Sequence, residues 1–480
     1  MRRLTRTAGA GVAALGVLGV LPGPALADGS EDELRPYRFA QDAHRIKGTK
    51  KSTDAPKLPT GLSRDSLSDD ETAYYRVTLD DKAHSYFSVT AAPKPRSEVD
   101  VRAYLRVRLL DPGDGECDQD DASFVNDSSA FPITAVVESA PEGGDCRPGQ
   151  HLLAVTRVHS TDGDPEPWPV EINAMREPRI RPGQQLPAPS NEKGGSKGVE
   201  PPRVEGEPRK IRGGTGFNDA VGVQQGARRD LLLPGQFRYY RIPLEWGQTL
   251  RTSAEIANTQ GDRTSVSAGL QLRVHNTVRG TVVGEEQTFT GMPQTINVQT
   301  PKVSYRNRDT GETDLEGARF SGWYYVSVAL TGEVAEEAPD GLPVNVRFQV
   351  VGKPEKVPEY KTDPHAAGFG VSDRDRRQAR DGRAADEAED DGNKRLIAYA
   401  GLGAGTVLLV GLGLWFWLPR RRAAATADGP DTSEPPTTPA PPPAGYGYPG
   451  DGAQGGYGHP PQGGRDGYGY PQGGGSPDGR

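Results

Sequence analysis

Apolar and polar residues alternate with a period of two along much of the first 353 residues of the chain. In the run 101–109, Val, Ala and Leu alternate with Arg and Tyr, and the runs 268–274 and 344–350 repeat this pattern. A period of two places alternate side chains on opposite faces of a strand, so one face is predicted to be buried and the other polar. Further strands are predicted at 74–79, 86–90, 239–244, 295–300 and 323–330. Many short strands separated by Gly, Pro, Asp and Asn turns indicate an all-β chain of antiparallel β-sandwiches.

The β-rich part of the chain is a duplicated unit. Residues 46–79 align without a gap with residues 211–244, and 12 of the 34 positions are identical, among them Gly48/Gly213, Asp65/Asp230, Tyr75/Tyr240 and Arg76/Arg241. The offset between the copies grows from 165 to 174 residues towards their ends, as expected when loops of different length join shared strands. We therefore predict two tandem domains, at 28–180 and 211–353, joined by a Pro- and Gly-rich linker at 181–210. Each domain is expected to have its own core and to fold without the other.

The two ends of the chain predict a membrane topology. Residues 396–418 form an uncharged apolar run that is followed by Pro419 and three arginines. As a helix it would span about 34 Å, enough to cross a hydrocarbon core of about 30 Å, and the arginines mark its cytoplasmic end. Residues 1–27 combine early arginines, a short apolar core and an Ala-Leu-Ala cleavage site, which is typical of a signal peptide. The chain is thus predicted to be a single-pass cell-membrane protein with extracellular N-terminal domains.

The segments next to the membrane differ in composition. Residues 354–395 are rich in charged side chains and are predicted to be a stalk that spaces the domains from the membrane. Residues 419–480, rich in Pro, Gly and Tyr, are predicted to be a disordered cytoplasmic tail. Within the span, Gly401 and Gly405 form a GxxxG face that predicts helix packing, so self-association through the span is an open alternative to a monomer.

Charge argues against nucleic acid as a partner. The chain has 57 basic and 65 acidic residues, a net charge of -8, and the arginines are interleaved with acids along its whole length. A nucleic-acid-binding protein would show a clustered basic surface instead. Only 34% of the residues are hydrophobic, whereas Gly and Pro number 62 and 43, so much of the chain cannot be core.

The two cysteines are Cys117 and Cys146, both in the first copy. Outside the cell an isolated pair of this kind predicts a disulfide. A redox-active or metal-binding pair is the alternative, although the spacing is not CxxC. The acidic run 111–121 is predicted to be a solvated loop rather than a calcium site, because it lacks the DxDxDG register.

Motifs for catalysis are absent from the sequence. It contains no GxSxG or SxxK motif and no HExxH motif, and its histidines are scattered. The chain is therefore predicted to be a non-enzyme without a cofactor or a resident metal. The paired tyrosines at 74–75 and 239–240 could form a sugar-binding platform, but we expect one of each pair in the core and its neighbour on the strand surface. In the second copy this assigns Tyr240 to the core and leaves Tyr239 and Arg241 outside.

Two segments of the second copy carry a resemblance to a known family. Residues 239–248, YYRIPLEWGQ, look like the strand pair that opens bacterial pre-peptidase C-terminal-like jelly-roll domains, and the later strand GWYYVSV at 322–328 fits the same order. The chain is similar to such β-domains in membrane-anchored von Willebrand A-type surface proteins. The A domain's DxSxS motif is missing here, so its metal-dependent adhesion is not implied. The resemblance implies tandem jelly-roll-like domains and no particular reaction.

These observations favour a single-pass cell-surface protein that displays two β-sandwich domains in a bacterial envelope. Its expected partner is an envelope protein or a glycan. The alternative is an accessory or regulatory subunit of an envelope enzyme or of a secretion system.

Overall fold

The computed structural model describes residues 34–387, except 101, 114, 125–129, 141–145, 159–164 and 260–264. The described residues fall within one compact unit. The predicted signal peptide, the predicted span with Gly401 and Gly405, and the predicted tail lie outside the described residues. Among the residues that are described, no helix is long and apolar enough to cross a membrane.

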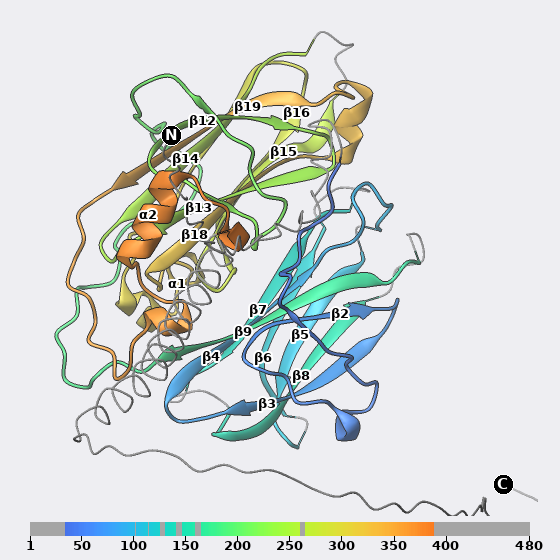
Figure 1. Ribbon diagram of the computed structural model, residues 1–480, viewed down its shortest axis with the longest axis vertical. Coiled ribbons are helices and arrows are strands. Elements are labelled where there is room, and N and C mark those ends of the chain that lie inside the picture. The colour runs from blue at the N-terminus through green and yellow to red at the C-terminus, as the bar shows by residue number, and fades with distance from the viewer. Residues whose placement is uncertain are drawn as a thin grey trace, which may run out of the picture. The chain divides into compact units, whose positions relative to one another are not determined.

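The first half of the described chain folds into a two-sheet β-sandwich (Figure 1). In spatial order, one sheet contains β1 (His44–Arg45), β2 (Gly61–Leu67), β9 (Trp168–Pro178), β4 (Ala83–Ala91) and β7 (Ile133–Ser139). The other sheet contains β3 (Thr72–Leu79), β8 (Gly149–Val158), β5 (Tyr104–Leu110) and β6 (Glu116–Ser123). All pairings are antiparallel except that of β1 with β2.

The second half repeats this arrangement with one additional short strand, β11. One sheet has the order β10 (Arg209–Lys210), β12 (Gly226–Leu232), β19 (Leu342–Val351), β14 (Thr249–Ile256) and β17 (Gln294–Gln299). The other has the order β11 (Val221–Gly222), β13 (Gln236–Leu244), β18 (Gly322–Leu330), β15 (Val266–His275) and β16 (Thr281–Phe289). The short helices are η1 (Ser52–Asp54), η2 (Tyr305–Asp309), α1 (Thr313–Glu316), η3 (Gly332–Glu336), η4 (His365–Ala367) and α2 (Asp373–Asp381). The prediction of two tandem β-sandwiches is confirmed. Eight main strands in two sheets are also the arrangement of a jelly roll.

A hydrogen-bonded cluster at equivalent positions explains part of the sequence repeat. In the second sandwich, Asp230 accepts hydrogen bonds from the Gly213 N–H (2.7 Å) and the Tyr240 hydroxyl (2.7 Å). In the first sandwich the equivalent Asp65 accepts from the Gly48 N–H and the Tyr75 hydroxyl, both at 2.7 Å. A Cβ atom at the glycine would lie 2.8 Å from Tyr75 Cζ in the first copy and 3.0 Å from Tyr240 Cζ in the second. The repeat thus preserves the glycine, aspartate and tyrosine because each needs the other two.

The prediction for the two faces of β13 is correct for one face and wrong for the other. Tyr240, Ile242 and Leu244 lie in the core of the second sandwich, as predicted. Tyr239 and Arg241 were expected on the outside, but they are 2% and 6% exposed. The prediction is wrong for them because the outer face of β13 is itself covered, by the first sandwich and by α2.

The outer face of this sheet joins the core of the first sandwich. The core cluster of the first sandwich continues into Phe217, Ala220, Phe237, Tyr239 and Ala329 of the second. The second sandwich keeps a separate core of its own. Independent folding of each copy stays a prediction, and a fragment of the second copy would expose this apolar face to water.

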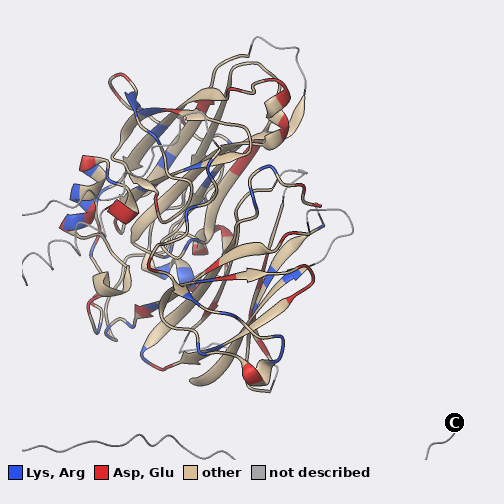
Figure 2. Cartoon of the chain, turned by 45° about the vertical axis from the view of Figure 1, so that its right-hand side comes forward, with Lys and Arg blue, Asp and Glu red and all other residues tan. Residues whose placement is uncertain are grey.

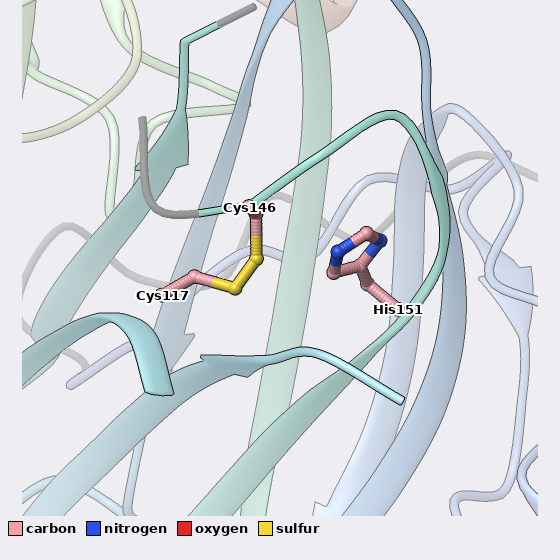
Figure 3. Close-up of side chains that lie close together, drawn as sticks. All are labelled: Cys117, Cys146 and His151. Carbon is pink, nitrogen blue, oxygen red and sulfur yellow. A yellow bond between two sulfur atoms is a disulfide. The ribbon is translucent and has the colours of Figure 1, made fainter. Parts of the chain in front are cut away.

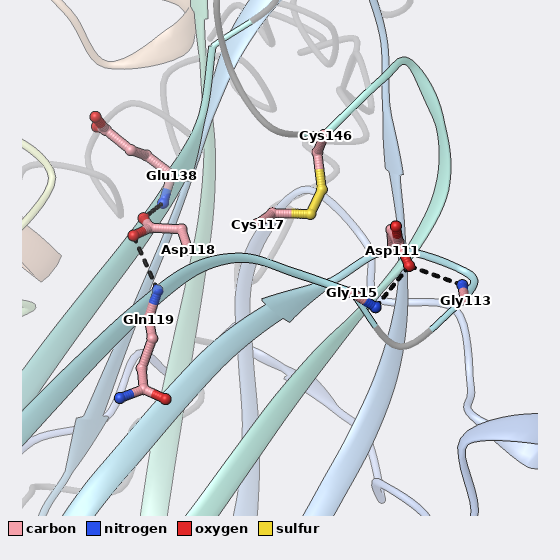
Figure 4. Close-up of a disulfide and its surroundings, with 8 residues drawn as sticks. All are labelled: Asp111, Gly113, Gly115, Cys117, Asp118, Gln119, Glu138 and Cys146. Atoms are coloured by element: carbon pink, nitrogen blue, oxygen red, sulfur yellow. Dashed lines mark hydrogen bonds between the residues drawn. A yellow bond between two sulfur atoms is a disulfide. The ribbon is translucent and has the colours of Figure 1, made fainter.

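The acidic run 111–121 was predicted to be a solvated loop, but this holds for only part of it. Its second half belongs to strand β6, in which the Asp118 carboxylate points towards the backbone of Glu138 on β7 (Figure 4). Asp118 accepts a hydrogen bond from the Glu138 N–H (2.7 Å), and Asp120 accepts one from the Val136 N–H (2.8 Å). The two carboxylates on edge strand β6 therefore bond to backbone N–H groups on β7, the edge strand of the other sheet. These contacts protect both sheet edges from pairing with another chain.

The described part of the predicted stalk packs onto the sandwiches. Tyr360 forms a β-bridge with Ile180, and Phe369 is buried in a cluster with Tyr86, Val278 and Phe320. Helix α2 then lies against β11 and β13. The segment is hydrophilic overall, but a few apolar residues attach it to the sandwiches. Residues 354–387 therefore do not act as a free spacer.

Candidate functional site

The two cysteines form a disulfide, as predicted. Cys117 lies on β6, Cys146 precedes β8, and their Cα atoms are 5.4 Å apart. The imidazole of His151 lies beside the sulfur atoms (Figure 3) and is almost fully buried. Because sulfur atoms in a disulfide are not thiolates, this group of three offers no metal site. The disulfide fixes an edge strand, which is a structural role.

Removing this disulfide should destabilise the first sandwich. The loop-entropy model gives about 3.5 kcal/mol for a loop of this length. We expect Cys117→Ala to lower the melting temperature of the purified chain. A reducing agent should lower the melting temperature of the wild type and leave that of the variant unchanged. A variant that melts with the wild type under oxidising conditions would contradict the structural role.

A more promising region lies where the two sandwiches meet, on the outer face of β9. Val170, Ile172 and Ala174 point into the first core, so Glu171 and Glu177 point the other way, towards the second sandwich. Both glutamates are 0% exposed. A buried carboxylate is costly unless it is paired and hydrogen-bonded, so each needs partners supplied by the second half of the chain.

Glu171 joins three parts of the chain. It bonds to the Arg279 guanidinium at 2.6 Å and to the Asn218 amide at 2.9 Å, both from the second half, and to the Ala40 N–H (3.0 Å) and the Tyr37 hydroxyl (3.3 Å) near the N-terminus. Burial alone would lower the pKa of Arg279, but the Glu171 carboxylate outweighs it and raises that pKa. Arg279 therefore remains charged within the interface.

Glu177 forms a second junction of the same kind. It accepts two hydrogen bonds from Arg308 (3.0 and 3.1 Å), one from the Tyr86 hydroxyl (3.0 Å) and one from the Tyr360 hydroxyl (3.0 Å). Burial would raise the pKa of Glu177, but Arg308 outweighs it and lowers that pKa. The first sandwich, the second sandwich and the C-terminal segment thus meet at one carboxylate.

A cleft of about 550 Å³ opens beside the Glu171 junction. Eight stretches that are distant in sequence line it: 40–42, 62, 173–175, 217–218, 241, 277–279, 323–325 and 365–386. Its volume lies within the 300–1,000 Å³ typical of small-molecule sites, and such sites are frequent where domains meet. This interdomain cleft is the candidate functional site.

One wall of the cleft carries two aromatic side chains from β18. Trp323 and Tyr325 are two residues apart on the outer face of the strand, and both are partly exposed. The Trp323 indole donates a hydrogen bond to Asp375 (3.0 Å), and the Arg241 guanidinium lies 4.3 Å above its ring centre. Arg241 in turn donates to Gln378 of α2 at 3.1 Å. Helix α2 is therefore fastened to the wall at both Asp375 and Gln378.

The helix that closes this wall has well-defined ends. Ser372 caps α2 and forms a capping box with Asp375, which fixes the carboxylate that Trp323 uses. Gly370 before the helix and Gly382 after it adopt positive φ values of 81° and 66°. Left-handed backbone of this kind favours glycine, so turns delimit α2 on both sides.

A second cavity, of about 750 Å³, lies between β6 and β7 of the first sandwich and β15 and β18 of the second. Its acidic groups already have partners: Asp118 and Asp120 bond to backbone N–H groups, and Glu138 pairs with Arg319. His275, which bonds to Ser327 at 3.1 Å, has its pKa lowered to about 3 by burial and by Arg273. This cavity is therefore a polar seam between the domains and not an evident cation site.

Charged side chains of both signs are interspersed over the two sandwiches (Figure 2). This agrees with the interleaving of acids and bases in the sequence. Such a surface offers no extended field for an oppositely charged polymer.

None of the residues singled out from the sequence as a site lines the interdomain cleft. Cys117 and Cys146 are elsewhere, and Gly401 and Gly405 lie outside the described residues. Sequence reasoning missed Trp323, Arg241 and the Glu171 junction. A usable signal existed in strand WPVEINAMREP, where two glutamates share one parity, opposite to that of Val170, Ile172 and Ala174.

Comparisons with known proteins give no family for the chain. No protein-family model matches it, and no curated protein matches it. Among solved structures, the CUB1-EGF-CUB2 domain of human MASP-1/3 is 12% identical and covers 60% of this chain and 100% of that chain, with a TM-score of 0.16. The CBM22-1-CBM22-2 tandem domain of Paenibacillus barcinonensis Xyn10C is 12% identical and covers 66% and 99%, with a TM-score of 0.16. The tandem CBM51 modules of a family 98 glycoside hydrolase from Streptococcus pneumoniae are 10% identical and cover 60% and 83%, with a TM-score of 0.17. TM-scores this far below 0.5 carry no inference about ligand or activity.

Proposed function

We propose that this chain is a membrane-anchored, non-catalytic binding protein of a bacterial envelope, and that its ligand enters the interdomain cleft. The observation that carries the proposal is the cleft itself. Eight stretches distant in sequence, two partly exposed aromatic side chains and a buried ion pair converge on it. A merely structural interface would instead close over its aromatic side chains.

The predicted signal peptide and the apolar run 396–418 support the anchoring part of the proposal. They place the two sandwiches outside the cell and the Pro- and Gly-rich tail inside. The order of predicted strands and aromatic residues at 239–248 and 322–328 supports membership of the pre-peptidase C-terminal-like jelly-roll domains.

One observation favours the regulatory alternative. Helix α2, which contributes to the wall of the cleft, ends at Asp381, and the predicted span begins at residue 396. A ligand that contacts Asp375 or Gln378 would thus act on the segment that leads to the membrane. In that case the protein would report occupancy of the cleft to an envelope enzyme or a secretion system.

Trp323→Ala tests the proposed site. We expect it to reduce retention of the purified full chain on isolated bacterial envelopes at least tenfold in a sedimentation assay, because it removes an aromatic wall of the cleft. Tyr104→Ala is the matched control, since Tyr104 is a partly exposed strand aromatic of the first sandwich that does not line the cleft. Thermal unfolding of both variants checks that they fold. Equal retention of the two variants would contradict the proposal.

A further inference from the structure

We infer that the interdomain cleft binds an uncharged saccharide through a buried hydroxyl and two neighbouring aromatic rings. This inference rests on the proposed function, because it names the chemistry of the ligand for the same site.

Several charged groups on the walls already have partners. Arg279 pairs with Glu171 at 2.6 Å, Asp386 pairs with Arg38 at 2.9 Å, and Asp375 accepts from Trp323. Arg241 is only 6% exposed, because it bonds to Gln378 and is covered by Trp323. Since an anionic ligand needs an accessible guanidinium or ammonium group that is not already neutralised, these contacts favour a ligand without charge.

Neutral hydrogen-bonding residues, by contrast, also line the cleft. Thr277 lies in the turn between β15 and β16, is 5% exposed and lines the cleft, and its Oγ1 has no hydrogen-bond partner within the described part of the chain. A buried hydroxyl without a partner costs about 1–3 kcal/mol, which a ligand that bonds to it would recover. Asn173 and Tyr325, which carry an amide and a hydroxyl, line the same cleft. A hydroxyl can donate and accept at once, and sugar hydroxyls present the same dual character.

The aromatic wall suits a flat, partly apolar ring. Trp323 and Tyr325 stand on one face of β18, and alternate residues of a strand are about 6.6 Å apart. Tyr325 is held edge-on by Phe217, with ring centres 5.1 Å apart, and Trp323 is held by Asp375. Fixed aromatic rings of this kind offer apolar contact area at little entropic cost, and each has a polar atom at its rim. A sugar ring stacks its C–H face on such a surface while its hydroxyls reach the neutral groups nearby.

Calorimetric titration of the purified full chain tests the inference. The probes are tetrasaccharides of N-acetylglucosamine, mannose and galactose, with a galacturonate tetramer as the anionic comparison and tetra-alanine as the peptide comparison. We expect at least one neutral tetrasaccharide to bind and the galacturonate tetramer and peptide not to bind. Thr277→Val, which keeps the shape but loses the hydroxyl, should weaken the binding about tenfold.

Two further variants distinguish a lost contact from a damaged fold. Thr277→Ser keeps the hydroxyl and should bind within about threefold of the wild type, and Tyr325→Phe should weaken binding without lowering the melting temperature. If the galacturonate tetramer or the peptide binds in a manner that depends on Trp323 while the neutral sugars do not, the saccharide inference is wrong and the proposed site stands. If Trp323→Ala changes neither these titrations nor envelope retention, both are wrong.

Discussion

Glu177→Ala should lower the free energy of unfolding by about 3–5 kcal/mol, because it leaves the buried Arg308 without a counter-charge. Arg308 is held by Glu177 at 3.0 Å, and the same carboxylate also binds Tyr86 and Tyr360. Urea unfolding of the purified full chain measures the change. Because the junction joins the two sandwiches and the C-terminal segment, the variant should unfold at a lower urea concentration than the wild type.

Another Glu–Arg pair on the same molecule provides the control. Glu255 pairs with Arg347 across two strands of the second sandwich, and both side chains are about a third exposed. Surface pairs of this kind contribute about 0–1 kcal/mol, so Glu255→Ala should have little effect. Comparable costs for the two substitutions would mean that the Glu177 junction does not hold the domains together.

The junction also predicts a pH dependence. Arg308 lowers the pKa of Glu177 below its ordinary value, so the carboxylate stabilises the folded chain at neutral pH. This contribution is present above the ordinary glutamate pKa and is lost as the pH falls through the lowered one. The Glu177→Ala variant should therefore lose less stability than the wild type on acidification.

Asp230→Ala should be the second most damaging substitution and should cost more than the equivalent Asp65→Ala. Both changes remove an acceptor for a glycine N–H and a tyrosine hydroxyl. In the second copy, however, Asp230 also lies 3.7 Å from Arg238, whose side chain is 2% exposed, whereas Lys47 beside Asp65 is 61% exposed. We expect about 3–5 kcal/mol for Asp230→Ala, as for breaking a buried pair, and a smaller loss for Asp65→Ala.

Thermal and urea unfolding of the two aspartate variants make this comparison within one protein. The glycine, aspartate and tyrosine match between the two sites, whereas Arg238 of the second copy aligns with Ala73 of the first. The difference in stability loss therefore reports on the buried arginine. A larger loss for Asp65→Ala would show that the lone pairs of the carboxylate matter more than the charge behind it.

The sequence predicted the parts of the fold that depend on local pattern. Period-two alternation correctly assigned Tyr240, Ile242 and Leu244 to a core, and the repeat correctly implied two sandwiches. Alternation cannot tell whether the outer face of a strand meets water or another domain. For that reason Tyr239 and Arg241, which have the outward parity, were wrongly expected on the surface.

Composition misled where a few residues decide the structure. The charged segment after residue 353 contains Tyr360 and Phe369, and these two anchor it to the sandwiches. The acidic run before Ser123 has the composition of a loop, yet it forms a strand because Asp118 and Asp120 meet the N–H groups of a neighbouring sheet edge. The interdomain cleft could not be predicted at all, since its walls come from eight stretches that are up to about 350 residues apart.

The central claim is that the ligand enters the interdomain cleft, and site-specific photo-crosslinking in living cells tests it most directly. A benzophenone amino acid would replace Gln41, an exposed residue at the cleft, or Thr78, an exposed residue on β3 of the first sandwich that does not line it. We predict a saccharide-containing adduct from position 41 and none from position 78. An adduct from position 78 alone, or equal adducts from both positions, would contradict the claim.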